Sequence, residues 1–179
     1  MSKEIINRVS NSSLINIDLE ELYPAGRRIS LDIKDWLYEG IILKEKDFRT
    51  SVRNHDWSIY KDSFVALTCS EDAIIPSWAY LLISAKLAPF AKKIVVGDLE
   101  VLETIIFSEI IENYNTERLQ DKSIIIKGCA NKPIPSSAFA MLIQKLHPIA
   151  KTIMYGEACS TVPISKRKKR SFRRMVRKW

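Results

Sequence analysis

The sequence has few of the residues on which several common kinds of site depend. Of its 179 residues, five are glycine, three are cysteine and two are histidine. It contains no glycine-rich phosphate-binding loop, no G-x-S-x-G nucleophile elbow and no H-E-x-x-H zinc motif. Three cysteines are too few, and too odd in number, for a disulfide framework. We therefore expect a protein of a reducing compartment, the cytoplasm, without a standard nucleotide or hydrolase site.

Long hydrophobic runs are also missing. The longest, near residues 79–87, contains Lys86 and is shorter than the roughly 20 residues that a membrane-spanning helix needs. The N-terminal MSKEIINRVS has neither a long apolar stretch nor a small-residue cleavage site, so we expect no secretory signal. With 46% hydrophobic and 27% charged residues, the chain is predicted to fold around a substantial core.

Positive charge is scarce outside the C-terminal end. The formal net charge is +7, but residues 166–178 hold nine basic residues and no acidic one. Residues 1–165 carry 19 basic and 21 acidic residues, so they are slightly acidic. We interpret the chain as one domain over residues 1–164 followed by a basic tail, 165–179.

An internal repeat organises the middle of the chain. PSWAYLLISAKLAPFAKKIVVG (76–97) matches PSSAFAMLIQKLHPIAKTIMYG (135–156) at 10 of 22 positions, where chance gives roughly one or two. Each copy has a proline where a helix should begin and a second proline where it should end. Short apolar runs before and after each helix are typical of buried strands.

This pattern predicts an α/β fold with a mostly parallel sheet flanked by helices. The duplicated β-α-β unit spans about residues 64–97 and 123–156, within a core of residues 63–164, and residues 99–113 form a joining helix. Residues 14–19 and 29–33 read as further strands and 34–52 as mostly helical, so residues 1–62 supply flanking elements.

All three cysteines follow strands of the predicted sheet, and so we expect them at one edge. Thiolates are the usual ligands of iron–sulfur clusters and of soft metals. We therefore predict a metal site of Cys69, Cys129 and Cys159, with an iron–sulfur cluster as cofactor. Zinc fits less well, because the spacings of 60 and 30 residues lack the paired C-x₂-C pattern. Candidates for a further ligand or rim residue are Asp98, Glu157 and His55.

Two other roles for the cysteines stay open. Free cysteine often packs as a small hydrophobe, which would make all three inert. A thiol-dependent enzyme would instead use a thiolate activated at a helix start, as expected for Cys69 or Cys129. Such an enzyme needs a base nearby, and His147 stands at the opposite end of its β-α-β unit. The sequence identifies no catalytic residue and leaves open whether the protein is an enzyme.

The tail suggests a function of its own. Phe172, Met175, Val176 and Trp179 are spaced as one face of a helix, among basic residues. A segment of this kind binds RNA, a ribosome, an anionic membrane or a partner protein, which makes a non-catalytic adaptor the alternative function. A disordered, solubilising tail is the simpler interpretation.

Several segments together resemble a known family. KDWLYEGIILKEKDFR, ALTCSEDAIIPSWAY, IIKGCANKPIPSSAF and GEACSTVPISKRK are similar to the bacterial family called domain of unknown function 2480, over residues 3–168. The family name records no activity. The resemblance implies iron–sulfur assembly proteins as partners and a role in cluster assembly or repair. The basic tail departs from the family pattern.

Overall fold

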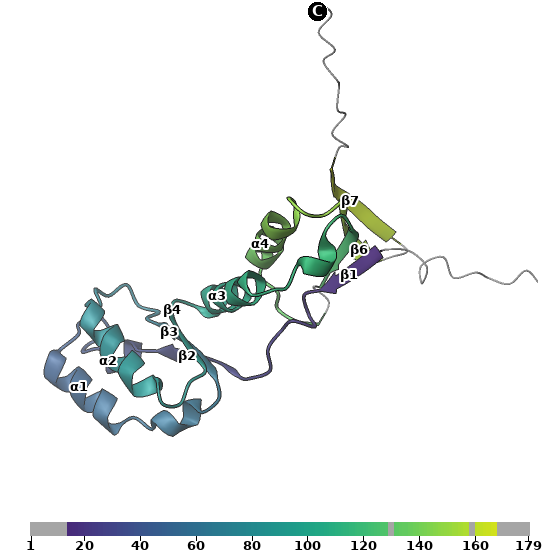
Figure 1. Cartoon of the computed structure of the whole chain (residues 1–179). Coiled ribbons are helices and arrows are strands. Elements are labelled where there is room, and N and C mark those ends of the chain that lie inside the picture. The colour runs from purple at the N-terminus through teal and green to yellow at the C-terminus, as the bar shows by residue number, and fades with distance from the viewer. Residues whose placement is uncertain (1–13, 129–130, 158–159, 168–179) are drawn as a thin grey trace, which may run out of the picture. The chain divides into compact units, whose positions relative to one another are not determined.

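The computed structural model describes residues 14–128, 131–157 and 160–167 (Figure 1). The chain divides into two compact units. Unit 1 comprises residues 1–22, 113–134 and 139–179, and unit 2 comprises residues 23–112 and 135–138. Within the described ranges, no helix has the length and apolar character needed to cross a membrane.

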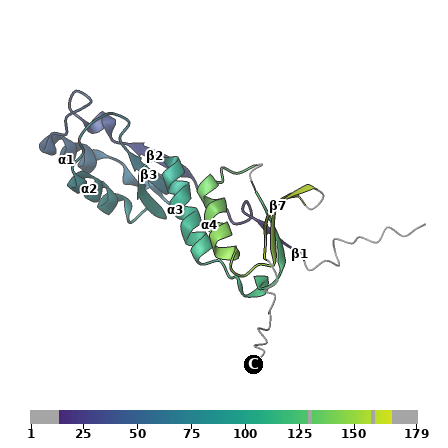
Figure 2. The same ribbon diagram turned by 90° about the horizontal axis from the view of Figure 1, so that it is seen from above.

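Unit 2 is built on a parallel sheet in the order β2-β3-β4. Its strands are β2 (Arg28–Asp32), β3 (Phe64–Thr68) and β4 (Lys93–Val96). Its helices are α1 (Glu45–Asn54), α2 (Ser77–Leu87) and α3 (Leu99–Glu112). Figure 2 shows α1 and α2 on one side of β2 and β3, with α3 on the other side.

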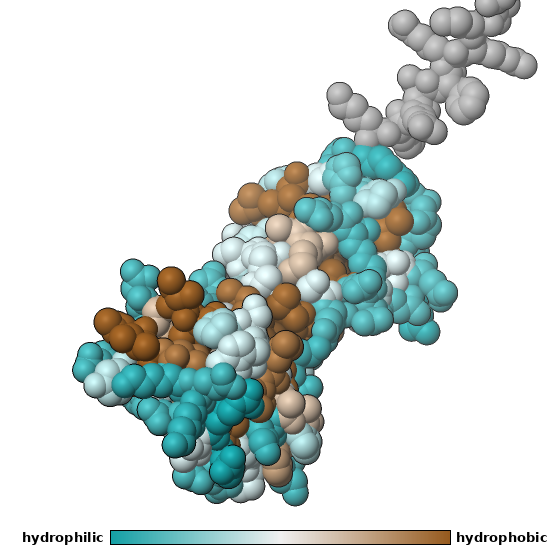
Figure 3. All heavy atoms as spheres, turned by 90° about the vertical axis from the view of Figure 1, so that its left-hand side faces the viewer, coloured by the Kyte–Doolittle hydropathy of each residue, from teal (hydrophilic) through white to brown (hydrophobic). Residues whose placement is uncertain are grey.

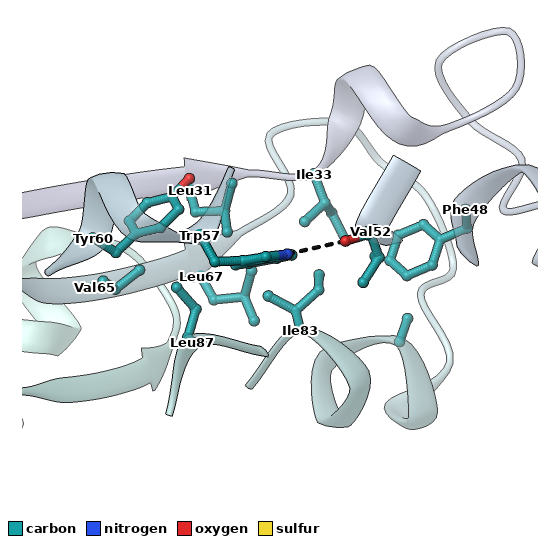
Figure 4. Packing of buried hydrophobic residues seen from close by; sticks show 11 residues of the cluster. Leu31, Ile33, Phe48, Val52, Trp57, Tyr60, Val65, Leu67, Ile83 and Leu87 are labelled. Carbon is teal, nitrogen blue, oxygen red and sulfur yellow. Dashed lines mark hydrogen bonds between the residues drawn. The ribbon is translucent and has the colours of Figure 1, made fainter. Parts of the chain in front are cut away.

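The central strand β3 is buried on both faces, as its run of apolar residues requires. Side chains alternate along a strand, so Val65 and Leu67 point to the face covered by α1 and α2 (Figure 4). Phe64 and Ala66 point to the opposite face and pack against Leu102 and Ile106 of α3. Each large apolar side chain buried in this way stabilises the fold by about 1.5–3 kcal/mol.

Unit 1 has a four-stranded sheet in the order β1-β5-β6-β7. β1 (Leu14–Asp18), β5 (Ser123–Lys127) and β6 (Thr152–Glu157) are parallel, and β7 (Ser160–Lys166) returns antiparallel to β6. α4 (Ser136–Leu146) connects β5 to β6. Pro163 lies in β7, an edge strand, which is where a sheet tolerates proline.

The α/β class and the duplicated unit are confirmed. One copy forms β3-α2-β4 and the other forms β5-α4-β6, and in each copy the two strands pair directly and in parallel. Pro76 and Pro135 stand immediately before the two helices. The helices end at Leu87 and Leu146, two residues before the next proline. The proline signals therefore located both helices correctly.

The N-terminal strands extend this likeness. Asp18 is the register partner of Lys127, and Asp32 is the register partner of Thr68. Lys127 and Thr68 are themselves equivalent, because they stand 59 residues apart, which is the period of the repeat. Each unit thus contains three neighbouring parallel strands, with an aspartate at the end of the first of them in the chain.

Three expectations differ from the structure. The strands form two sheets, because β1 pairs with one copy of the repeat and β2 with the other. The helix expected over 34–52 begins only at Glu45, after a turn in which Glu39 and Gly40 have positive φ. The sheet also continues to Lys166, two residues into the segment interpreted as tail.

Candidate functional site

A hollow lies where β1, β5 and β6 of unit 1 end. Parallel strands bring their carboxyl ends to one edge, where the following loops leave room for a ligand. Eight residues line the hollow: Asp18, Glu20, Lys127, Gly128, Asn131, Tyr155, Gly156 and Glu157. They come from the ends of three neighbouring strands and from the loops that follow β1 and β5.

Three charged side chains meet across these strand ends. Lys127 Nζ lies 3.4 Å from Asp18 Oδ2 and 3.9 Å from Glu157 Oε1. The hydrogen bond to Asp18, followed by the charge of Glu157, raises the pKa of Lys127 above its usual value. Lys127 therefore stays protonated between two carboxylates. With Glu20, the hollow holds three carboxylates and one ammonium group, a combination that favours a cation.

Hydrogen bonds fix the loops around the hollow. Asp18 Oδ1 accepts from the backbone N–H of Glu20 at 2.9 Å. Glu20 in turn accepts from the backbone N–H of Asn131 at 3.0 Å and from its side-chain Nδ2 at 3.3 Å. These bonds tie the loop after β1 to the loop after β5, although the two are more than 100 residues apart in sequence.

Two glycines give the hollow its shape. Gly128 has φ +124°, and a Cβ there would lie 3.1 Å from the backbone N of Leu19. Gly156 has φ +115°, and a Cβ there would lie 2.6 Å from the carbonyl oxygen of Ser160. Larger residues would be strained at both positions, as expected for glycines at a strand-end rim.

The equivalent edge of unit 2 has a different chemistry. Asp32 accepts hydrogen bonds from the backbone N–H groups of Lys34 and Ser70, both at 3.1 Å. Partial burial would raise the pKa of Asp32, but the hydrogen bonds from Ser70 and Lys34 outweigh it and lower the pKa. Thr68 stands where unit 1 has Lys127, and the ammonium group near Asp32 is instead that of Lys34, 3.9 Å from Asp32 Oδ2.

The predicted thiolate ligands divide between the two units. Cys69 follows β3 in unit 2, is partly buried against the core and donates to the carbonyl oxygen of Glu71 at 3.6 Å. Cys129 and Cys159 lie outside the described residues, directly after Gly128 and two residues after Glu157. The prediction that all three cysteines share one edge assumed a single sheet. β3, which precedes Cys69, belongs to the sheet of unit 2, whereas β5 and β6 belong to the sheet of unit 1. Within the described ranges, no three His, Cys, Asp or Glu side chains are placed to hold a metal ion.

Asp98 and His55 have local partners in unit 2. Asp98 caps α3, because its Oδ1 accepts from the backbone N–H of Val101 at 2.8 Å. His55 packs edge-on against Trp57, with ring centroids 4.7 Å apart, and its Nε2 lies 3.0 Å from the hydroxyl of Tyr60. Burial lowers the pKa of His55, and the charge of Asp56 opposes this only in part.

The tail residues Phe172, Met175, Val176 and Trp179 lie outside the described residues. The root of the tail is described. Arg167 forms an ion pair with Asp121, and its backbone N–H donates to the carbonyl oxygen of Lys151 at 3.0 Å. The basic segment therefore starts from a fixed point on unit 1.

Comparison with known proteins gives one match. The family described as protein of unknown function (DUF2480) matches residues 3–167. The chain belongs to this family. No curated protein and no solved structure matches it.

Sequence reasoning missed Asp18, Glu20, Lys127 and Asn131. The sequence did contain a signal for Asp18. LINIDL (14–19) and RISLDI (28–33) both place an aspartate directly before an aliphatic residue that is buried in the structure. Aligning these two strands as part of the repeat would have placed Asp18 and Asp32 at the same rim position.

Proposed function

We propose that the protein binds a soft metal ion or an iron–sulfur cluster at the hollow of unit 1, with Cys129 and Cys159 as thiolate ligands. The observation that carries this proposal is where the lining residues stand in the sequence. Gly128 and Asn131 line the hollow and flank residues 129–130. Glu157 lines it too and pairs with Ser160 across residues 158–159. Cys129 thus directly follows a residue that lines the hollow, and Cys159 stands two residues after another.

The charges of the hollow suit this chemistry. Thiolates together with carboxylates such as Asp18 and Glu157 bind iron and zinc. The nearby ammonium group of Lys127 favours deprotonation of neighbouring thiols, since a positive charge lowers a thiol pKa. A bound cation is also favoured by the excess of carboxylates. A bound metal or cluster would fit a role in iron–sulfur cluster assembly or repair.

Anaerobic purification followed by metal analysis and visible spectroscopy tests the proposal. We expect bound iron or zinc in the full chain and its loss in Cys129→Ser and in Cys159→Ser. Cys69→Ser is the matched control, because Cys69 follows the equivalent strand of unit 2, and its metal content should be unchanged.

Two results would contradict this assignment. A protein that stays colourless and metal-free after reconstitution with iron and sulfide does not bind a metal or cluster. Equal loss of metal in all three variants would replace the two-cysteine site with the three-cysteine site predicted from the sequence.

A further inference from the structure

The strand-end edge of unit 2 exposes an apolar surface. Five aliphatic residues, all more than 40% exposed, stand at the end of β4 or on the segments after β2, β3 and β4: Ile41, Ile42, Ile74, Val96 and Leu99. Ile74 is 94% exposed, the largest exposed fraction of any large hydrophobic residue in the described ranges. Figure 3 shows apolar side chains gathered on this face of unit 2. Grouped apolar residues on a domain surface mark a site of interaction.

The three segments share one edge of the sheet. β2, β3 and β4 are parallel neighbours, so the residues that follow them emerge side by side. The hydrogen bond from the backbone N–H of Ser70 to Asp32 joins the segment after β3 to the end of β2. The exposed aliphatic residues therefore belong to one edge of unit 2.

The segments that carry these apolar residues are rich in acidic residues. Residues 32–44, 69–76 and 96–100 contain seven acidic and two basic residues. The acidic ones are Asp32, Asp35, Glu39, Glu71, Asp72, Asp98 and Glu100. In the part of the chain that the structure describes, Asp32 alone of these seven forms an ion pair, with Lys34 at 3.9 Å. An acidic surface of this kind attracts a basic apolar partner and repels RNA phosphates and anionic lipids.

The chain itself contains a segment with the complementary chemistry. Residues 168–179 hold seven basic residues and no acidic one. Phe172, Met175, Val176 and Trp179 are spaced as one helical face of this segment. We propose that the C-terminal segment, residues 168–179, binds the strand-end edge of unit 2. Its apolar face covers residues such as Ile41 and Ile74, and its basic residues pair with the surrounding carboxylates. The inference does not rest on the metal site of unit 1.

Photo-cross-linking in the full chain tests this binding. Benzoylphenylalanine in place of Phe172 is irradiated, and the products are mapped by mass spectrometry. We expect cross-links to residues 38–44 and 69–76. The size of the product shows whether the segment reaches its own chain or a second copy, because only the latter gives a cross-linked dimer.

Two variants make the test specific. Ile74→Asp puts a charge into the apolar surface and should lower the cross-linking yield about fivefold or more. Ile164→Asp is the matched control, because Ile164 is an isoleucine that is 50% exposed in β7 of unit 1, and it should leave the yield unchanged. Both residues are exposed, so circular dichroism should show an unchanged fold. Raising the salt concentration from 0.05 to 0.5 M should also lower the yield, because salt screens surface charges.

Other outcomes would overturn the inference. One is a yield that Ile74→Asp leaves unchanged, and another is a set of cross-links confined to unit 1. A third is efficient cross-linking to added RNA or to vesicles of anionic lipid, with none to unit 2. The last result would assign the segment to an external anionic surface instead.

Discussion

Units 1 and 2 repeat one architecture but differ at the edge where their parallel strands end. In unit 1 this edge is a charged hollow, in which Lys127 lies between Asp18 and Glu157. In unit 2 a threonine replaces the lysine, and exposed aliphatic side chains such as Ile74 stand on segments rich in acidic residues. Register and backbone were kept, while the side chains at equivalent positions diverged. Our two proposals accordingly assign different ligands to the two edges: a metal ion or cluster in unit 1 and a basic apolar segment in unit 2.

The two units also use ion pairs differently. In unit 1 the Asp18–Lys127 pair is open to solvent, whereas in unit 2 Arg28 Nε lies 2.7 Å from Glu103 Oε1 with both side chains largely buried. Arg28 also stacks over Tyr23, and the hydroxyl of Tyr23 donates to Glu103. Removing one member of a buried pair leaves an uncompensated charge, which is far more costly than losing an exposed pair.

The largest effect is therefore expected for Glu103→Ala, which should lower the free energy of unfolding of unit 2 by about 3–5 kcal/mol. Tryptophan fluorescence during urea unfolding measures it in a Trp179→Phe background. Trp36, Trp57 and Trp78 then report on unit 2 alone.

Glu109→Ala is the matched control on the same helix, since Glu109 forms an exposed ion pair with Lys93. It should cost less than about 1 kcal/mol. If the two variants lower the free energy of unfolding by similar amounts, the buried Arg28–Glu103 pair stabilises unit 2 no more than an exposed ion pair does.

A smaller loss of stability is expected in unit 1 from Gly156→Ala. A Cβ at φ +115° would lie 2.6 Å from a backbone oxygen, so the β6–β7 connection must shift, at a cost of about 2–3 kcal/mol. Hydrogen exchange should become faster in β6 and β7 and stay unchanged in β3.

Gly40→Ala serves as the comparison, because nothing lies within 4 Å of a Cβ at Gly40. Gly40→Ala should lower the free energy of unfolding by only about 1 kcal/mol, because alanine is strained at a positive φ but meets no other atom there. Equal costs at the two glycines would mean that the contact with Ser160 is relieved without strain.

The smallest effect concerns pH and the two histidines. Burial lowers the pKa of His55 in the folded state, so unfolding takes up a proton below the unfolded value of about 6.5. The stabilisation is fully present above that pH and is lost as the pH falls through the folded pKa. Urea midpoints of unit 2 should therefore fall between pH 7 and pH 5.

His55→Gln should weaken this pH dependence. His147→Gln should leave it intact, because His147 is exposed in unit 1. A slope that stays the same in His55→Gln would assign the pH dependence to other groups.

Local features of this fold were predictable from the sequence, but the pairing of distant segments was not. Proline positions and apolar periodicity located α2, α4 and their strands, since these signals act over a few residues. β1 pairs with β5, 109 residues later, and no local pattern specifies that partner. The charged hollow was missed for the same reason, because Asp18 and Lys127 become neighbours only through this pairing. Only the last two residues of β7 were assigned to the tail, and Pro163 and the basic residues that follow obscure the strand pattern of this segment.

β7 runs antiparallel to β6 and so carries the chain from the hollow to the opposite end of the sheet in unit 1. Ser160 pairs with Glu157 beside the hollow, and Lys166 pairs with Thr152 at the start of β6. Five residue steps of strand place about 17 Å between these points. Arg167 is then held by Asp121, just before β5 begins. The chain thus reaches Arg167 at the end of the strands opposite the hollow, so a fluorophore attached close to residue 167 would lie away from the mouth of the hollow.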